Sequence, residues 1–154
     1  LRFYFRNRMR REETIDHHIK AAWHSIARMY NQQAALYDAT MAMGYVLLVI
    51  NAEEGTPATK IAPLMGLEPR SLTRLLNTME ERGVIARKSD LTDKRSIRVM
   101  LTAKGKQMRE KAKETVLQFN QMVRHEIEPE KLDVFFEVIT KIQQVVEREP
   151  IHEN

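Results

Sequence analysis

One face of the segment from Pro69 to Gly83 combines residue types that hydrogen-bond nucleic acid bases and phosphates. The apolar positions 72, 75, 76 and 79 have the i, i+3, i+4, i+7 spacing of a helix that packs one side on a core. The opposite side presents Arg70, Arg74, Asn77, Thr78 and Glu81, with Ser71 and Thr73 near the N-terminal end. Arginine suits guanine edges, asparagine suits adenine, and hydroxyls and helix N-termini suit phosphate. The pattern predicts a DNA-recognition helix; the alternative is a solvated face with surface ion pairs.

A second charged group lies where the spacing predicts the tip of a β-hairpin. It consists of Lys88, Lys94, Arg95 and Arg98, with Asp90 and Asp93 between them. A basic loop beside a recognition helix is placed to enter an adjacent minor groove. Asp93 would then bond backbone amides of the turn or hold a neighbouring arginine extended. The alternative is a charged loop that stops an edge strand from pairing with another chain, and both roles are compatible.

The net charge of +4 is unevenly distributed along the chain. Residues 1–11 carry +5 and residues 57–101 carry +4, whereas residues 12–56 carry −4 and residues 102–154 carry −1. Such asymmetry indicates an anionic partner for the middle of the chain, although a solvated face produces the same count.

Helical periodicity predicts the elements that position these groups. Apolar residues recur at helical spacing over 12–31 and again over 41–52, and we expect Gly55 to end the second helix. Thr56 is predicted to cap a short helix with Pro57 at its first position. Gly66 closes that helix, and the recognition segment follows three residues later at Pro69.

The period then changes to that of a hairpin. Residues 84–88 are β-prone, and Ile97, Val99 and Leu101 alternate on one face of a second strand. Thr102 is predicted to cap a long helix, and a break at Glu128-Pro129 precedes a final helix. A short helix, a tight turn, a second helix and a hairpin make a winged helix-turn-helix.

The fold class is therefore mainly α with a small β-hairpin wing. We expect residues 37–101 to form the winged lobe, residues 12–36 and 102–148 a helical dimerisation region, and residues 1–11 a basic tail. The first helix and the last two are amphipathic and would expose apolar stripes on a monomer, so a second copy of the chain is the simplest partner.

The stretch SLTRLLNTMEERGVIARKSDLTDKRSIRVMLTAKGKQM resembles the MarR (multiple antibiotic resistance regulator) family of transcription factors. The matching pieces are the pattern from Ser71 to Leu75, the run from Met79 to Ile85, Asp93-Lys94-Arg95 in the wing, and Leu101-Thr102-x-x-Gly105. The resemblance covers roughly residues 12–148 when the predicted helices are included.

The resemblance implies a homodimer on double-stranded DNA with a pseudopalindromic operator, Arg95 in the minor groove and Asp93 orienting the wing. It implies repression that a small aromatic or amphipathic effector releases. The corresponding segments offer His17, His18, Trp23, His24, Arg28, Tyr37, Met41 and Tyr45 as effector-pocket candidates. The alternative for Trp23, Met41 and Tyr45 is an ordinary core position.

Other classes of function are disfavoured. The chain has no cysteine, which excludes disulfides and thiol-based sensing. Asp16-His17-His18 spells a phosphoesterase triplet but lacks a carboxylate cluster, and His24 adds no paired ligand, so we expect no metal, no cofactor and no enzymatic activity. No apolar run is long enough for a bilayer, and we expect a cytoplasmic protein. The main rival is a winged-helix module for protein–protein assembly, since fold does not fix function.

Overall fold

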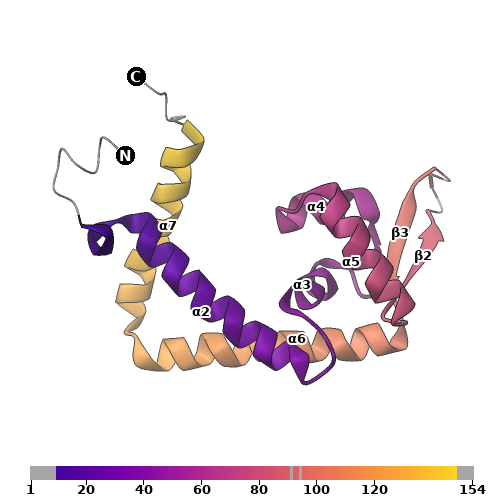
Figure 1. Cartoon of the computed structure of the whole chain (residues 1–154), viewed down its shortest axis with the longest axis horizontal. Helices are drawn as coiled ribbons and strands as arrows, with labels where there is room; N and C mark the ends of the chain where they lie inside the picture. The colour runs from indigo at the N-terminus through magenta and orange to yellow at the C-terminus, as the bar shows by residue number, and fades with distance from the viewer. Residues whose placement is uncertain (1–9, 91, 94, 149–154) are drawn as a thin grey trace. The chain divides into compact units, whose positions relative to one another are not determined.

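The computed structural model describes residues 10–90, 92–93 and 95–148. The elements are the 3-10 turn η1 (Arg11–Glu13), α2 (Ile15–Ala35), α3 (Met41–Val49), β1 (Thr56–Pro57), α4 (Ala58–Met65), α5 (Pro69–Glu81), β2 (Ile85–Ser89), β3 (Ile97–Leu101), α6 (Ala103–Glu126) and α7 (Pro129–Arg148) (Figure 1). The chain divides into two compact units that meet between Thr115 and Val116, inside α6. The mainly α architecture with a small antiparallel sheet confirms the predicted fold class.

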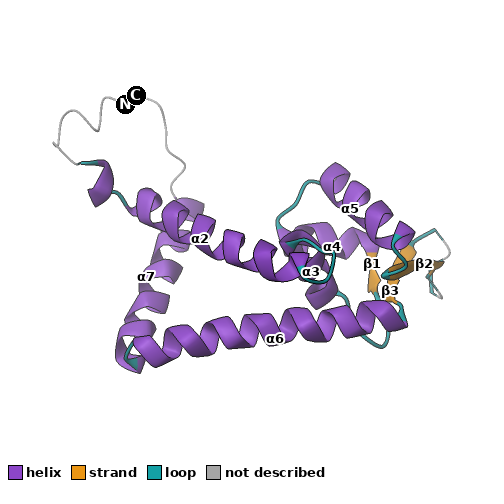
Figure 2. Cartoon of the chain, turned by 60° about the horizontal axis from the view of Figure 1, so that its bottom comes forward, coloured by secondary structure: helices purple, strands orange, loops and turns teal. Residues whose placement is uncertain are grey.

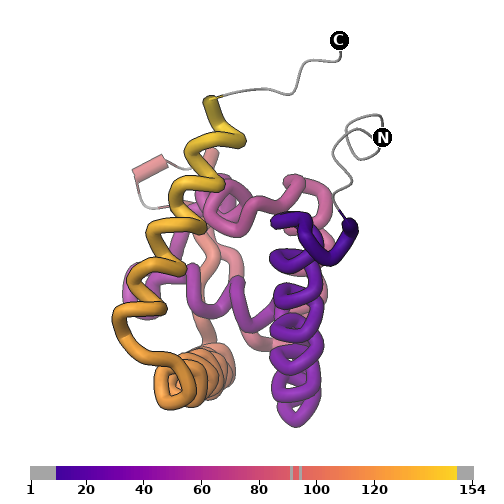
Figure 3. The backbone as a smooth tube through the Cα atoms, turned by 90° about the vertical axis from the view of Figure 1, so that its left-hand side faces the viewer, coloured from indigo at the N-terminus to yellow at the C-terminus, as the bar shows by residue number. Residues whose placement is uncertain are grey.

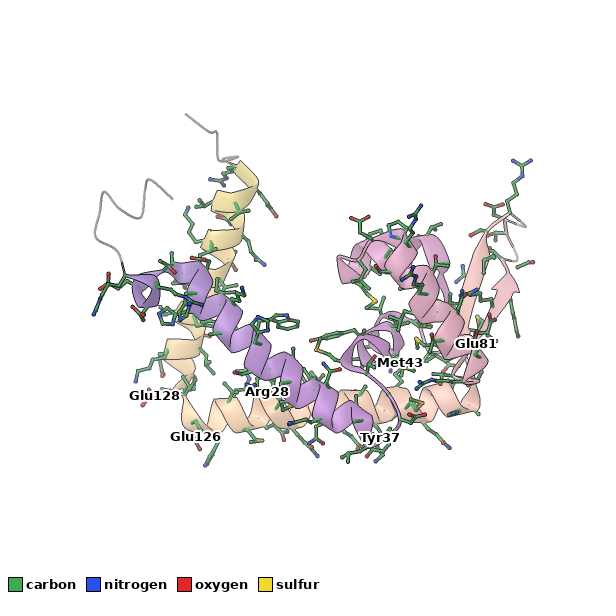
Figure 4. All side chains as sticks on the ribbon, viewed as in Figure 1. Arg28, Tyr37, Met43, Glu81, Glu126 and Glu128 are labelled. Carbon is green, nitrogen blue, oxygen red and sulfur yellow. The ribbon has the colours of Figure 1, made fainter. Side chains whose placement is uncertain are left out.

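The first unit has one continuous apolar core. Three residues of helix α3 lie in this core, namely Met43, Val46 and Leu47. Figure 4 labels Met43. The other buried apolar residues of this core are Ile50, Ile61, Ala62, Leu72, Leu76, Met79, Val84, Ile85, Val99 and Leu101. The predicted apolar stripe of α5 is thus the side that packs on the core.

Helices α4 and α5 form the predicted helix-turn-helix. Gly66 ends α4 in the left-handed conformation, with φ +61°, which glycine adopts without a steric penalty. Pro69 occupies the first turn of α5, where the missing N–H has no intrahelical partner to lose. The two-residue interval between Gly66 and Pro69 holds the turn.

The wing is part of a three-stranded antiparallel sheet with the order β1-β3-β2, and the strands lie together in Figure 2. Strand β1 pairs Thr56 with Val99 and Pro57 with Arg98. The prediction that Thr56 caps a helix is therefore wrong: its hydroxyl accepts the Asn51 N–H at 2.9 Å, and α4 begins at Ala58.

Gly55 also has a role different from the predicted one. Helix α3 already ends at Val49, and Gly55 lies in the following loop with φ +69°. A Cβ there would stand 2.2 Å from Met100 Sδ and 2.6 Å from the Val99 carbonyl oxygen. Gly55 is needed because β3 crosses its backbone at close range.

The start of α6 is fastened to the end of the recognition segment. The Thr102 hydroxyl donates to Gly83 O at 2.7 Å and accepts the Gly105 N–H at 3.0 Å, which confirms the predicted cap. A Cβ on Gly105 would approach Val84 O to 2.1 Å. Thr102 and Gly105 together let α6 pack directly on the backbone at Val84.

A short elbow joins α2 to α3. Asp38 lies there with φ +52°, a conformation that L residues other than Asn and Asp rarely adopt. Its carbonyl oxygen accepts a hydrogen bond from Arg82 Nη1 at 2.5 Å, and its carboxylate lies 3.5 Å from the same nitrogen. The elbow is therefore tied to the residue that follows α5.

The second unit contains the C-terminal half of α6 and all of α7, which follows after a sharp turn (Figure 3). Leu132 is the buried residue of α7. Several apolar side chains of this unit are about half exposed or more, namely Leu117, Met122, Val134, Phe135, Phe136, Val138, Val145 and Val146. Within the described ranges, no helix is long and apolar enough to cross a membrane.

Candidate nucleic-acid interface

The polar face of α5 is accessible along its length. Arg70, Ser71, Arg74 and Asn77 are exposed, and Thr78 is partly so. Two hydroxyls on this helix bond backward to the helix itself: Thr73 Oγ1 donates to Pro69 O at 2.9 Å, and the Thr78 hydroxyl donates to Arg74 O at 3.2 Å. Each hydroxyl therefore keeps its lone pairs as acceptors, while its single proton is already used.

Arg87 is a residue that the sequence analysis missed. It lies on β2, and its Nη2 donates to Asn77 Oδ1 at 2.8 Å. Glu80 accepts the Arg87 backbone N–H at 3.1 Å and lies 3.6 Å from its guanidinium. Arg87 thus connects the middle of the recognition helix to the wing strand.

Asp90 organises the base of the wing loop. Its Oδ1 accepts the Thr92 N–H at 2.9 Å, the Thr92 hydroxyl at 2.6 Å and the Asp93 N–H at 3.3 Å. Its Oδ2 accepts Arg98 Nε at 2.8 Å. The Asp90 residue is only 6% exposed, so the turn is built around a buried carboxylate.

The hydrogen bonds from Thr92, followed by the Arg98 guanidinium, hold the pKa of Asp90 well below its usual range. Each of these donors is matched to the charged form of the carboxylate. Asp90 is therefore ionised at neutral pH, and the wing loop depends on that charge.

Arg98 differs from the other basic residues that the sequence assigned to DNA. Besides Asp90, its guanidinium bonds the Glu54 and Gly55 carbonyl oxygens, each at 3.2 Å. The side chain is 29% exposed. Its donors are directed into the lobe, where they fasten β3 to the loop before β1.

Asp93 and Arg95 occupy the exposed end of the same loop. Asp93 Oδ1 accepts the Arg95 backbone N–H at 3.0 Å, which is the first of the two arrangements predicted for this carboxylate. Ser96 closes the turn by donating its N–H to Asp93 O at 2.9 Å. The Arg95 backbone is fixed in this way while the side chain stays exposed.

The remaining predicted wing residues are Lys88, which is exposed on β2 opposite Arg98, and Lys94, which lies outside the described residues. Ile97 is half exposed, in contrast to the buried Val99 and Leu101 of the same strand. Ile97 belongs to the predicted alternating face but lies beyond the end of the core.

The effector-pocket candidates lie on α2, the elbow and α3. Trp23 and Tyr37 are 47% and 46% exposed, so neither is an ordinary core residue in the single chain. His24 and Arg28 are also exposed, whereas His17, Met41 and Tyr45 are partly buried. Figure 4 shows Arg28 in the middle of α2 and Tyr37 beyond its end.

Tyr45 connects α3 to α2 through an aromatic pair. Its ring lies edge-on to that of Tyr30, with centroids 6.3 Å apart, a favourable aromatic geometry. Partial burial raises the pKa of both phenols, and for Tyr30 the neighbouring Tyr45 adds to the effect. Both phenols are therefore neutral at physiological pH.

Comparison with known proteins agrees with this architecture. The family model described as the MarR family matches residues 40–97, the stretch that runs from the start of α3 into β3. The HTH-type transcriptional regulator TtmR of Methylorubrum extorquens (strain PA1) is 33% identical over 93 residues, which are 60% of this chain and 48% of TtmR. The chain spans about half the length of the curated relatives it matches.

Solved structures share the fold over most of the chain. A complex of Staphylococcus aureus MepR with DNA has a TM-score of 0.79 at 19% identity, covering 86% of this chain and 98% of MepR. The transcriptional repressor CouR bound to a 23-mer DNA duplex has a TM-score of 0.75 at 25% identity, covering 86% of this chain and 94% of CouR.

CouR from Rhodococcus jostii RHA1 bound to p-coumaroyl-CoA has a TM-score of 0.72 at 22% identity, covering 94% of this chain and 99% of CouR. TtmR is an HTH-type transcriptional regulator and CouR a transcriptional repressor, which agrees with the prediction of a DNA-binding regulator in place of an enzyme. The chain therefore has a winged helix-turn-helix fold, and its residues 40–97 match the MarR family model.

Proposed function

We propose that the chain acts as a homodimeric transcriptional regulator that binds a pseudopalindromic DNA operator. In this proposal residues 37–101 form the DNA-binding lobe, residues 12–36 and 102–148 form the dimerisation region, and the tail 1–11 belongs to neither. Helix α5 enters the major groove, and the wing enters the adjacent minor groove.

The observation that carries the proposal is the exposed basic surface shared by α5 and the wing. Arg70 and Arg74 lie on the accessible face of the helix, while Lys88 and Arg95 lie on the hairpin that follows it. An interaction module for proteins would present apolar anchors on this face. The DNA-bound structures of MepR and CouR support the same assignment, since both share the fold.

The proposed contacts divide into two kinds. Arg70, Ser71, Thr73, Arg74, Asn77 and Thr78 approach bases and phosphates from the helix, and Lys88, Lys94 and Arg95 approach from the wing. Asp93 and Arg98, which the sequence grouped with them, act within the protein: Asp93 fixes the backbone at Arg95, and Arg98 anchors the wing to the lobe.

Dimerisation is supported by the apolar faces that the single chain leaves exposed. On α2 these include Ile15, Ile19 and Trp23, and on α7 they include Phe135 and Phe136. Apolar surface of this extent indicates an interface between copies. Two lobes related by a twofold axis would match two half-sites of an operator.

We further propose that an aromatic or amphipathic small molecule binds beside α2 and α3 and releases the protein from DNA as a derepressor. The candidates are His17, Trp23, His24, Arg28, Tyr37, Met41 and Tyr45. Apolar walls with a few polar groups suit such a ligand. The CouR complexes with DNA and with p-coumaroyl-CoA support a regulator of this type.

The experiment that tests DNA binding is the salt dependence of affinity for a random duplex, followed by selection of bound sequences from a random pool. Neutralisation of several phosphates per lobe should lower affinity about 1,000-fold or more between about 50 and 200 mM salt. Arg74→Ala should make the logarithm of affinity fall less steeply with the logarithm of salt concentration. Lys113 is an exposed cation on α6, and Lys113→Ala should leave this slope unchanged. Affinity that is absent or insensitive to salt would contradict the proposal and favour a protein partner.

A further inference from the structure

The contact between Arg87 and Asn77 determines which hydrogen-bonding groups the middle of α5 offers to a ligand. Arginine has five N–H donors and no acceptor. The amide atom that faces its guanidinium must therefore be the Asn77 oxygen, and the 2.8 Å separation of Nη2 and Oδ1 is that of a good hydrogen bond. The Asn77 NH₂ group then points away from Arg87.

Arg87 is itself held in place on two sides. Its backbone N–H is on the outer side of β2, the edge strand of the sheet, and is accepted by Glu80 Oε1. Glu80 Oε2 lies 3.6 Å from Nη1, so the carboxylate orients the guanidinium as well. Asn77 and Glu80 are three residues apart on α5 and so present the same side of the helix to β2. The guanidinium is only about a quarter exposed.

We infer that Arg87 is a specificity-determining residue that makes Asn77 a hydrogen-bond donor towards DNA. This inference rests on the proposed function, because it concerns the base pair or phosphate that α5 meets. Among the described residues, Asn77 Nδ2 has no hydrogen-bond partner, and the residue is exposed.

The chemical consequence is a change in which base Asn77 reads. An unrestrained asparagine recognises adenine with two bonds, in which Oδ1 accepts from N6 and Nδ2 donates to N7. With its oxygen turned towards Arg87, Asn77 instead offers donors, which match the N7 and O6 acceptors of guanine or the O4 of thymine. The base opposite Asn77 should therefore be guanine or thymine in preference to adenine, whose N6 amino group would find no acceptor on Asn77.

The first arm of the test needs no DNA. Urea unfolding of the full chain is measured for wild type, Arg87→Met, Asn77→Ala and the double variant. If the contact exists, the effect of the double variant on the unfolding equilibrium constant should differ by about twofold or more from the combined effects of the two single variants. Additive effects of the two substitutions would overturn the inference at its structural basis.

The second arm selects bound duplexes from a random pool with three proteins. Wild type should show guanine or thymine at one position of each half-site, and Arg87→Met should gain tolerance for adenine at that position. Asn77→Asp, which offers acceptors only, should shift the preference by about tenfold towards the amino group of cytosine. Lys113→Met is the control for loss of a positive charge and should leave the selected sequence unchanged.

The outcomes separate this inference from the proposed function. Identical selected sequences for wild type, Arg87→Met and Asn77→Asp would overturn the role of Arg87 while leaving DNA binding intact. Failure of wild type to bind any duplex would refute the proposed function and the DNA-reading role together, even with coupling present in the first arm.

Discussion

The winged lobe and the outer helices α2 and α7 obtain their stability in different ways. Thirteen of the fourteen buried apolar residues among those described lie between Met43 and Leu101, so the lobe closes a core by itself. Helix α2 buries none of its residues, and α7 buries only Leu132. The lobe is thus specified within the chain, whereas the outer helices leave apolar faces exposed that the proposed dimer would cover.

The hydrogen bonds and ion pairs of the two regions also differ in which segments they join. In the lobe, Asp90, Arg98 and Arg87 each join segments that are distant in sequence or belong to different elements. Ion pairs of the long C-terminal helices, such as Lys111–Glu114 and Lys131–Glu128, join neighbours on the helix surface. Surface pairs of that kind contribute little to stability, whereas the bonds of Asp90, Arg98 and Arg87 link separate segments of the lobe.

A charge on the apolar face of α7 should have the largest effect. Val134, Phe135 and Val138 line an apolar hollow on this helix. Phe135→Glu places a carboxylate where the proposed interface is dry, so dimer affinity should fall about 100-fold or more. Sedimentation measures the dimer, and DNA affinity should decrease with it.

Thr140→Glu is the matched control for that substitution, because Thr140 is an exposed residue on the same helix. It adds the same charge and should leave the dimer unchanged. Equal dimer affinity in Phe135→Glu and wild type would remove α7 from the interface and weaken the contrast between the two regions.

Gly105→Ala tests whether the lobe tolerates any change where α6 joins it. A new Cβ would lie 2.1 Å from Val84 O, which is backbone and cannot rotate away. We expect a loss of about 3 kcal/mol in the free energy of unfolding, measured in urea. Gly83→Ala is the control, since φ is +67° there but the space is open, and it should cost about 1 kcal/mol. Equal losses would contradict the close packing.

Arg95→Ala tests the wing tip without touching the core. The side chain is exposed and its backbone is fixed by Asp93, so the lobe and the dimer should remain intact. Affinity for a selected operator should fall about tenfold or more. Unchanged affinity, measured by fluorescence anisotropy, would show that the wing does not contact DNA.

The charge of Asp90 should give the wing a characteristic pH dependence. Its pKa is lower in the folded state than in the unfolded chain, so the folded state binds fewer protons. The stabilisation is therefore present above about pH 4, near the unfolded pKa, and is lost as the pH falls towards the folded pKa. Asp90→Asn should be less stable than wild type at pH 7, and the difference should shrink below about pH 4. A difference in urea midpoint that stays constant with pH would contradict this assignment.

The smallest predicted effect is at the elbow between the two regions. Asp38→Gly removes the strain of φ +52° and retains the carbonyl bond to Arg82, so stability should rise by up to about 1 kcal/mol. The lost ion pair matters little because the Asp38 carboxylate is almost fully exposed. Asp38→Ala keeps the strain and should be less stable than Asp38→Gly. The reverse order in thermal unfolding would show that the Asp38 side chain itself stabilises the turn.

Much of the lobe could be predicted from local signals. The spacing of apolar residues in α5, the left-handed Gly66 and Pro69 in the first helical turn each depend on neighbouring residues only. The strand β1 could not be found this way, because two residues carry no periodicity and Thr-Pro equally suits a helix start. Its pairing with β3 is a tertiary contact.

The roles of the charged residues depended on tertiary structure as well. In sequence, Asp90 and Asp93 are equivalent acids in a basic loop, yet only Asp90 is buried and bonded to Arg98. Arg87 gave no local signal, since its partners Asn77 and Glu80 lie on another element. The hydrogen bonds from Arg98 to the Glu54 and Gly55 carbonyl oxygens could not be predicted either, because these residues are distant from Arg98 in sequence.

The short strand β1 has a consequence for the order in which the lobe folds. It joins Thr56 to Val99, and the bond from Arg98 to Gly55 closes a loop of 43 residues. Contacts of that separation form only after the intervening helices have shortened the loop, because closing a long flexible chain costs entropy. An isolated β2–β3 peptide would lack β1 and the Gly55 carbonyl, and two-stranded hairpins are marginal in water. We therefore expect the wing to reach its final geometry late, after α3, α4 and α5 have assembled.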